Sequence, residues 1–545
     1  MSVYKAAFRL AIVLAAAAGL GQPPAGQNFR ISGTVVNALS GQPLSHTQVA
    51  IGLPQNGAAQ AITTAEDGHF EFQNLRAGKY WLAAEHKGFA RQAFDEHEGF
   101  STAIAVGPNL ISENLIFRLR PDAVISGTIF DEQDEPVRGA QVMLFHRSIQ
   151  NGLRSTYSRG QEMTDDLGRY RFSQLHPGTY FVVVSAQPWY AQHGRAVKNV
   201  MCEGCEPATT FAPDEARSAL DVVYAITYYP GVTDANDAKP IMVKPGERVT
   251  ADITLGPVPA LSVRIKLART LSPESQGVTV TQRVFDADPI NVPGQSFVTT
   301  KGEMTIAGLP PGHFVLTFLS AGKEQNSREV EVDVTGDTEI SELEGTPASA
   351  VTGVVKLDGS LALPQRAHVL LRSRASGAEF GSRISAKGEF DFQNRPLPPG
   401  TYEVSVFTNQ RAAVKTIEAT GAKVTGHNIE IANATPVRLI VTLSQGLGQV
   451  AGIALREGRP LAGAMIVLVP EHPENNVPLF RRDQSDSDGT FNLPKVLPGK
   501  YTVVAIENGW DLEWSSADTL DRYIKQGTVV NVIANGRYNV ETVAQ

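Results

Sequence analysis

The same short motif recurs five times along this chain of 545 residues. In each copy, a glycine turn is followed by alternating apolar residues, a second glycine that usually follows proline, and another alternating run. The copies are DGHFEFQNLRAGKY (67–80), DLGRYRFSQLHPGTY (166–180), KGEMTIAGLPPGHF (301–314), KGEFDFQNRPLPPGTY (387–402) and DGTFNLPKVLPGKY (488–501). Their first glycines are 100, 134, 86 and 101 residues apart. A spacing near 100 residues is too long for a solenoid repeat and fits a small domain that folds by itself.

Each copy of the motif predicts two β-strands with turns at both glycines. Apolar residues two positions apart, such as Phe70 and Phe72, face one side of a strand. We expect positive φ at the first glycine and also at the second, as at Gly78, Gly178 and Gly499, because tight turns require it.

A further β-run that contains a glycine opens four of the five units. These runs are RISGTVV (30–36), VISGTIF (124–130), AVTGVVK (350–356) and QVAGIAL (449–455). The third unit instead opens with ALSVRIKL (260–267), which lacks the glycine. Each unit holds about seven short β-runs and no convincing amphipathic helix. The predicted fold class is therefore all-β, a tandem array of about five small antiparallel β-sandwiches.

The repeats set the expected division of the chain. We expect a signal peptide at 1–21, then β-sandwich one at 28–120, β-sandwich two at 121–256 with an insertion at about 187–240, a divergent β-sandwich three at 257–345, β-sandwich four at 346–445 and β-sandwich five at 446–545.

The first residues have the pattern of a secretory signal. Lys5 and Arg9 precede the apolar run LAIVLAAAAGL (10–20), and we expect cleavage near Ala18 or Gly21. Eleven apolar residues span only about half of a bilayer, which disfavours a membrane anchor. The sequence therefore predicts an exported protein without stable membrane insertion, in the periplasm, at the cell surface or outside the cell.

The repeated order of motifs resembles the carboxypeptidase regulatory-like domain. That order is SGTV, then G-x-P-L-x-x-A-x-V, then D-x-x-G-x-F/Y-x-F, then L-x-P-G-x-Y. It is clear in units one, two and five, moderate in four and weak in three. The resemblance implies a prealbumin-like, Ig-like β-sandwich, related to the starch-binding-like and collagen-adhesin folds. It also implies a non-catalytic module in exported multi-domain proteins.

Composition and motifs argue against several classes of function. The net charge of −8 gives no general attraction to nucleic acid. Among the 11 histidines only His427 is followed by Glu three positions later, at Glu430, and no His-Glu-x-x-His, Gly-x-Ser-x-Gly or P-loop occurs. Acidic turns at 165–168 and 486–489 offer oxygen ligands but lack the spacing of a calcium loop, so Asx-turns explain them. We therefore expect no enzyme, metal or cofactor.

Both cysteines, Cys202 and Cys205, lie in the expected insertion. An oxidising compartment favours a local disulfide between them. The alternative is a metal site, for which His193 is the only nearby extra ligand.

Exposed aromatic rings are the remaining candidates for a site, because sugars stack their apolar faces on flat rings. Trp189, Tyr190, Trp510 and Trp514 lie in irregular segments after the last strong strand of their units. Tyr228 and Tyr229 lie in the expected closing strands of unit two, where we expect them to line a groove. All six are candidate carbohydrate-binding residues, with hydrophobic packing under loops as the alternative.

The predicted function is a non-enzymatic exported binding or scaffold protein, with a glycan at the cell envelope as the first candidate partner. One alternative is a structural spacer or adhesin that binds an envelope or extracellular protein. Another is an accessory subunit of a secreted hydrolase.

Overall fold

The structure is a computed structural model, and it describes residues 28–53, 59–150, 152–191, 219–266, 276–285, 289–292, 296–300, 303–320, 327–341, 346–358, 367–374, 379–392, 396–408, 412–432 and 435–545. The expected signal peptide at 1–21 and both cysteines, Cys202 and Cys205, lie outside these residues. The signal peptide and the disulfide stay predictions.

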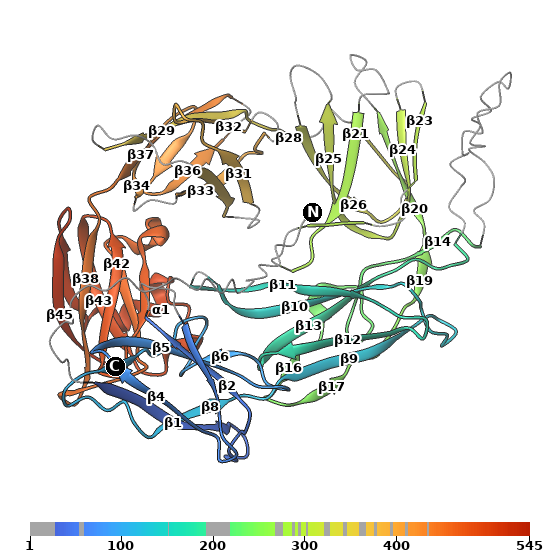
Figure 1. Cartoon of the computed structure of the whole chain (residues 1–545). Coiled ribbons are helices and arrows are strands. Elements are labelled where there is room, and N and C mark those ends of the chain that lie inside the picture. The colour runs from blue at the N-terminus through green and yellow to red at the C-terminus, as the bar shows by residue number, and fades with distance from the viewer. Residues whose placement is uncertain are drawn as a thin grey trace, which may run out of the picture.

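The described chain folds into five consecutive two-sheet units, as Figure 1 shows. Unit one consists of β1 (Phe29–Asn37), β2 (Gln48–Gly52), β3 (Ala59–Thr63), β4 (His69–Leu75), β5 (Gly78–Glu85), β6 (Gln92–Ala93), β7 (Ile104–Val106) and β8 (Leu115–Leu119). Unit two consists of β9 (Ala123–Phe130), β10 (Gln141–Gln150), β11 (Leu153–Met163), β12 (Arg169–Leu175), β13 (Gly178–Ser185), β14 (Val222–Tyr224), β15 (Thr227–Tyr228), η1 (Ala235–Asp237), β16 (Ile241–Val243), β17 (Arg248–Thr250), β18 (Ile253–Thr254) and β19 (Pro257–Pro259).

The other three units repeat this plan. Unit three consists of β20 (Leu261–Lys266), β21 (Gln276–Gln282), β22 (Ile290–Asn291), β23 (Ser296–Thr300), β24 (Glu303–Leu309), β25 (Gly312–Ser320), β26 (Ser327–Val334), β27 (Thr338–Ser341) and β28 (Thr346–Pro347). Unit four consists of β29 (Val351–Leu357), β30 (His368–Ser373), β31 (Glu379–Arg383), β32 (Glu389–Asp391), β33 (Gly400–Phe407), β34 (Ala413–Thr420), β35 (Lys423–Thr425), β36 (Asn428–Ile431) and β37 (Val437–Ser444). Unit five consists of β38 (Gly448–Arg456), β39 (Arg459–Pro460), β40 (Met465–Pro470), η4 (Pro473–Asn475), η5 (Val477–Leu479), β41 (Arg481–Gln484), β42 (Thr490–Val496), β43 (Gly499–Ile506), η6 (Gly509–Asp511), α1 (Ala517–Ile524), β44 (Thr528–Val532) and β45 (Arg537–Val543).

The all-β tandem fold predicted from the repeats is confirmed. The two strands of each motif belong to different sheets: in unit two, β12 pairs with β9, whereas β13 pairs with β10. The second glycine turn of the motif is therefore the crossover between the two sheets. The predicted residue boundaries between the units stay predictions.

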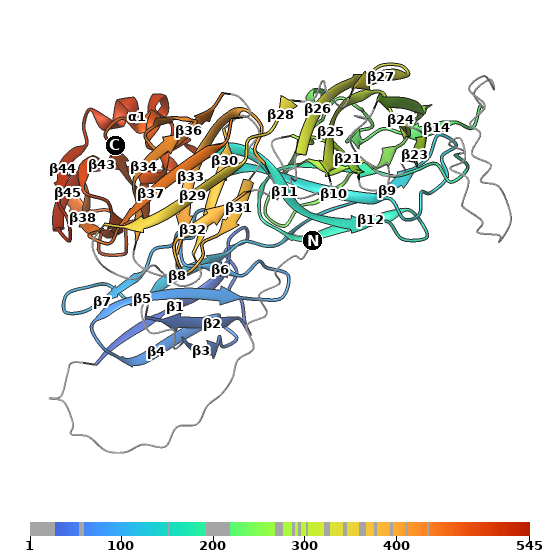
Figure 2. The same cartoon turned by 90° about the horizontal axis from the view of Figure 1, so that it is seen from above.

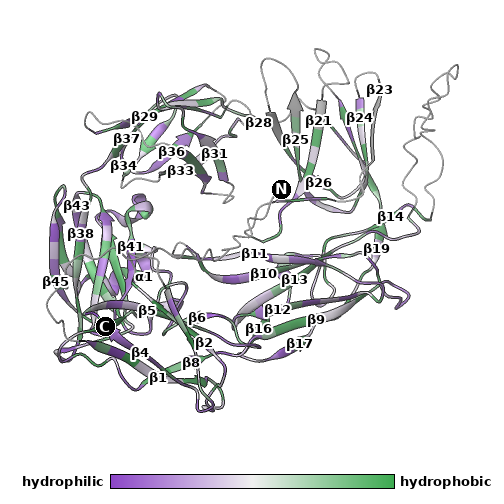
Figure 3. Cartoon of the chain, in the orientation of Figure 1, coloured by the Kyte–Doolittle hydropathy of each residue, from purple (hydrophilic) through white to green (hydrophobic). Residues whose placement is uncertain are grey.

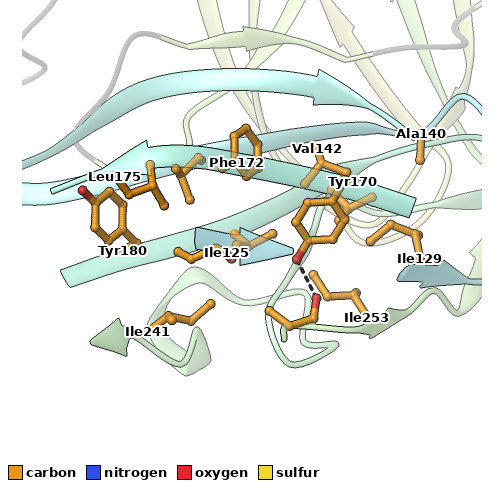
Figure 4. Close-up of a cluster of buried hydrophobic side chains, with 14 of the residues drawn as sticks. Ile125, Ile129, Ala140, Val142, Tyr170, Phe172, Leu175, Tyr180, Ile241 and Ile253 are labelled. Atoms are coloured by element: carbon orange, nitrogen blue, oxygen red, sulfur yellow. Dashed lines mark hydrogen bonds between the residues drawn. The ribbon is translucent and has the colours of Figure 1, made fainter. Parts of the chain in front are cut away.

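Alternation along the strands builds one core in each unit. Figure 3 shows hydrophobic and hydrophilic residues interspersed along the strands. In unit two, side chains from both sheets meet in a single cluster, and the Tyr170 hydroxyl donates a hydrogen bond to the Ala251 carbonyl inside it (Figure 4). Because buried polar groups need partners, this bond lets a tyrosine occupy the core.

The glycine of the opening strand is required by a close backbone approach. β9 pairs in parallel with β17 and β18, and the opening strand of every other unit likewise has a parallel neighbour beside its antiparallel one. A Cβ on Gly127 would lie 2.3 Å from the carbonyl oxygen of Ala251, and one on Gly452 would lie 2.1 Å from that of Val540. No side chain fits there without separating the strands.

The turn glycines follow the expectation only in part. Gly68, Gly168, Gly388 and Gly489 have φ between +69° and +87°, as predicted for the first glycine of the motif. The prediction of positive φ is wrong for Gly178 and Gly499, which do not have it. At Gly178 the reason for glycine is space, because a Cβ would lie 2.5 Å from Nε2 of His146.

Unit five contains a short helix that the sequence analysis did not predict. α1 buries Leu520 and Tyr523 against an apolar cluster on the outer face of β40 and β43. Its apolar pattern covers only eight residues, which is too short to distinguish a helix by periodicity. No helix among the described residues is long and apolar enough to cross a membrane.

The five units are arranged around a ring, which Figure 1 shows face on and Figure 2 from above. Phe285 of unit three packs its ring against Phe145, Phe181 and Tyr228 of unit two. The His427 N–H of unit four donates to the Asn475 carbonyl of unit five at 3.3 Å. Unit five then contacts unit one and closes the ring.

Candidate ligand-binding site at the junction of three units

The contact between units one and five includes backbone hydrogen bonds. We call it the clasp, and it joins residues 95–105, together with Lys79, to residues 482–490. The Ser487 N–H donates to the Ala103 carbonyl at 3.0 Å, and the Ala105 N–H donates to Oγ of Ser487 at 2.8 Å. The edge of β7 in unit one is therefore paired with the turn that starts the motif of unit five.

Polar side chains are fully buried in the clasp. Nε2 of Gln484, whose residue is 1% exposed, donates to the Asp95 carbonyl at 2.7 Å and to Oγ1 of Thr102 at 2.8 Å. Buried hydrogen bonds fix the relative orientation of two surfaces, because any sliding leaves donors without partners. The clasp is thus a specific interface.

The acidic turn at 486–489 belongs to this interface. Nζ of Lys79 donates to Oδ2 of Asp486, and Oδ1 of Asp486 accepts from the Ala103 N–H at 3.0 Å. Burial raises the pKa of Asp486, and Lys79 opposes that rise. Among the described residues, no group of three or more His, Cys, Asp or Glu side chains is placed to hold a metal ion.

Arg482 lies at the centre of the clasp. Its side chain is 4% exposed, and Nη1 donates to Oε2 of Glu98 of unit one at 2.7 Å. Cζ lies 4.7 Å from the ring centroid of Phe100, 4.9 Å from that of Trp510 and 5.5 Å from that of Trp514. The guanidinium is therefore held by one carboxylate and three aromatic rings, which suits its planar, delocalised charge.

Unit two reaches the same place through a long hairpin. β10 pairs with β11 over ten residue pairs, but with β13 only from Gln141 to Arg147, so the tip of the hairpin extends beyond its sheet. The Arg154 N–H donates to Oε1 of Glu513 at 3.0 Å, and the Ser515 N–H donates to the Gly152 carbonyl at 3.2 Å. The tip is thereby docked on unit five.

A cavity of about 660 Å³ lies where the three units meet. Its walls come from residues 92–99 and Arg120 of unit one, from both strands of the hairpin and the turn at 176–180 in unit two, and from Trp510 and Asp511 of unit five. This volume is typical of a pocket for a small ligand, and a composite pocket between domains is a common position for one.

His146 forms part of the cavity wall and is neutral at pH 7. Its ring stacks on Tyr180 with centroids 4.5 Å apart, and Nδ1 lies 3.0 Å from the Tyr157 hydroxyl. Burial, together with smaller contributions from Arg159 and His176, lowers the pKa of His146 to about 4.

This histidine is expected to make unit two sensitive to acid. Between pH 6.5 and 4 the unfolded chain binds a proton at His146 that the folded chain does not, so stability falls as the pH falls through this window. Lowering the pH from about 7 to about 5 should cost unit two roughly 1 kcal/mol through this group, after allowance for solvent screening. His146→Gln should weaken the pH dependence of the unfolding midpoint, whereas His69→Gln in unit one should not. An unchanged dependence in His146→Gln would show that the histidine is not buried in its neutral form.

The six predicted aromatic residues lie in different surroundings in the structure. Trp189 is 85% exposed and lies edge-on to Tyr190, whose hydroxyl donates to Glu132. Tyr228 is 2% exposed in the contact with unit three, so its ring has no free face, and Tyr229 packs against the core of unit two.

Trp510 and Trp514 are brought together around Arg482. Trp510 stacks on His97 at 4.5 Å between centroids and lies under Arg482. Both neighbours limit the area of the indole that is open to the cavity. Trp514 packs on Phe480 and lines a second cavity between units two, four and five. The role of the six residues as sugar platforms stays a prediction.

The residues of the hairpin were not identified from the sequence. Arg147, Arg154, Tyr157 and Arg159 form a run of basic and aromatic residues around Gly152, whose φ is +87°. The Asn-Gly dipeptide in the sequence and the unusual length of the flanking alternation were the available signals for an extended hairpin.

Comparison with known proteins finds a family match in the first two units. Residues 30–108 and 124–201 match the carboxypeptidase regulatory-like domain, which confirms the resemblance for these two segments. A search of curated proteins found no match.

Solved structures with similar sandwiches have low overall similarity to this chain. The Bacillus anthracis TIE protein is 12% identical, with 96% of this chain and 75% of that chain covered and a TM-score of 0.18. A streptococcal ancillary pilin is 13% identical, with 58% and 98% covered and a TM-score of 0.19. A minor pilin of Streptococcus agalactiae is 13% identical, with 42% and 96% covered and a TM-score of 0.20. Scores this low carry no functional argument.

Proposed function

We propose that this chain, which carries two carboxypeptidase regulatory-like domains within a tandem array of β-sandwiches, is a non-enzymatic exported binding and scaffold protein that holds a glycan at the cell envelope. The observation that supports this function is the cavity at the junction of units one, two and five. Because each unit supplies part of its wall, the complete cavity depends on the closed clasp.

The chemistry of the cavity suits a ligand with many hydroxyl groups. Tyr157, Gln150 and Ser148 of unit two offer hydroxyl and amide groups, and aromatic rings lie beside them. A sugar presents hydroxyl groups around its edge and C–H groups on its faces, so it needs such alternation of polar and aromatic contacts.

Export is supported by the basic and apolar residues at the beginning of the chain. The apolar run at 10–20 after Lys5 and Arg9 has the length of a signal peptide core. Detection of the mature N-terminus by sequencing of protein recovered from the periplasm or medium would test this part of the proposal.

Glycan binding is tested with the full chain and two matched variants. We expect a glycan array to give binding that Tyr157→Ala in the cavity reduces by about tenfold or more and that Trp189→Ala leaves unchanged. Binding that depends on Trp189 instead of Tyr157 would move the site to the exposed Trp189–Tyr190 pair. An array without any bound glycan would contradict the proposed function.

A structural spacer or adhesin is the second candidate. The second cavity, of about 470 Å³ between units two, four and five, is bordered by the exposed apolar side chains of Leu153 and Phe407. Exposed apolar residues at a groove are suited to a protein partner. A cross-linking experiment on intact cells would favour this candidate if Phe407→Asp abolished a specific protein adduct.

An accessory role for a secreted hydrolase would instead appear as faster product release when this chain is added to that enzyme.

A further inference from the structure

We infer that the ligand of the three-unit cavity carries an oxyanion group, either a carboxylate, a sulfate or a phosphate, on its sugar. This inference rests on the proposed function, since it names the chemical class of the glycan. It is carried by arginine side chains that line the cavity without a carboxylate partner.

The charges around the cavity do not cancel. Four arginines and three carboxylates line it, and they are Arg120, Arg147, Arg154, Arg159, Glu96, Glu98 and Asp511. Glu98 is neutralised by Arg482, which lies behind the wall in the clasp. Because the guanidinium of Arg147 lies over Phe181 on the other face of the hairpin, three cations face the two remaining carboxylates, and neither Arg120 nor Arg159 has an ion pair among the described residues.

Arg147 lies on the opposite face of the hairpin from His146. Its Cζ lies 4.6 Å above the ring of Phe181, and Nε donates to Oγ1 of Thr156 at 3.2 Å. Phe181 belongs to the apolar cluster that packs against unit three, whereas Tyr180, on which His146 stacks, belongs to the core of unit two. The guanidinium of Arg147 is therefore turned away from the His146 side of the cavity, and the inference rests on Arg120, Arg154 and Arg159.

A β-bulge places Arg159 at the cavity. Leu144 is paired with Gly160 and Phe145 with Ser158, so Arg159 is the extra residue of β11 and has no partner on β10. Bulges redirect side chains and are frequent beside binding sites. Without this extra residue, the side chains of β11 that follow the bulge would point to the opposite face of the hairpin.

The environment of His146 is consistent with positive potential in the cavity. Burial is the main reason for the lowered pKa of this histidine, and the next contributions come from the positive charges of Arg159 and His176. The histidine is contacted by the hydroxyl of Tyr157 on β11 and by the ring of Tyr180 on β13, and neither group is a carboxylate. An anionic ligand placed here would relieve this uncompensated charge.

The test is isothermal titration of the full chain with galactose, galacturonic acid, galactose 6-sulfate, galactose 6-phosphate and inorganic phosphate. We expect at least one acidic sugar to bind about tenfold or more tightly than galactose, and to bind more weakly as NaCl rises from about 50 to about 300 mM. The tightest of the three acidic sugars identifies the anionic group. Arg159→Gln should lower that affinity about tenfold or more, whereas Arg171→Gln, an exposed arginine on β12 outside the cavity, should not.

The outcomes separate the inference from the proposed function. Equal affinity for galactose and the acidic sugars would overturn the inference and leave glycan binding intact. Tight binding of an acidic sugar that Arg159→Gln does not weaken, in protein with an unchanged unfolding midpoint, would also overturn it. Inorganic phosphate binding as tightly as every acidic sugar would support the anion site and contradict the glycan function. Absence of binding to every probe would overturn both.

Discussion

Replacing Arg482 with methionine is expected to open the clasp between units one and five. The substitution removes the guanidinium that lies among Phe100, Trp510 and Trp514, and it leaves the Glu98 carboxylate without its partner in a half-buried position. Breaking a buried ion pair from one side costs about 3 kcal/mol or more, because the remaining charge is desolvated without compensation. Small-angle X-ray scattering should show a larger radius of gyration for the variant.

Two further variants identify the cause. Glu98→Gln combined with Arg482→Met should restore part of the compactness, since no orphan carboxylate remains. Arg456→Met removes an exposed ion pair with Glu507 inside unit five and should leave the scattering unchanged. An unchanged radius in Arg482→Met would show that the hydrogen bonds at 103–105 and 484–487 hold the clasp without the arginine.

Gly127→Val is expected to destabilise unit two by about 3 kcal/mol, at the upper end of the cost of overpacking. The added Cβ would lie 2.3 Å from the Ala251 carbonyl oxygen, and this oxygen also accepts from Tyr170. A backbone carbonyl between two strands has little freedom to move, so β9 would have to separate from β17 and β18. The measurement is the unfolding midpoint of unit two, followed by hydrogen exchange of the β9 amides.

Gly160→Val is the matched control in the same unit. No heavy atom lies within 4 Å of the Cβ position at Gly160, and its strand is exposed. A β-branched residue is favourable in an exposed strand, so we expect a change within about 0.5 kcal/mol. Equal destabilisation by both variants would mean that glycine flexibility, and not the close approach of strands, explains the repeated glycine.

The fold of each unit was predictable because its signals are local. The alternation at Phe70 and Phe72 and the positive φ at Gly68 depend on residues within a few positions in the chain. The second turn was predicted less well, because the glycine at Gly178 is required by His146, which lies 32 positions earlier in the chain. The need for glycine at position 178 becomes apparent only when β10 and β13 are paired.

The clasp was not predictable for a related reason. Lys79 and Asp486 are 407 positions apart, and each belongs to a segment that looks like an ordinary solvated turn or strand end. The two acidic turns have the same kind of sequence, but Oδ1 of Asp165 accepts from the N–H groups of its own turn, whereas Oδ1 of Asp486 accepts from Ala103 of unit one. Nothing local distinguishes the copy that binds unit one. The contacts of Trp510 could not be predicted either, because they come from His97 of unit one and from Arg482, which lies 28 positions earlier in the chain.

The position of the clasp has a mechanical consequence for a chain of tandem domains. In an open array, a force that pulls the two ends apart passes through every domain and every linker in turn. Here the first and last units are bonded to each other, so tension between them is carried by the clasp and by the hairpin tip that docks unit two on unit five, while units three and four remain unloaded in parallel. Rupture of these two contacts would release the slack of units three and four before any sandwich unfolds.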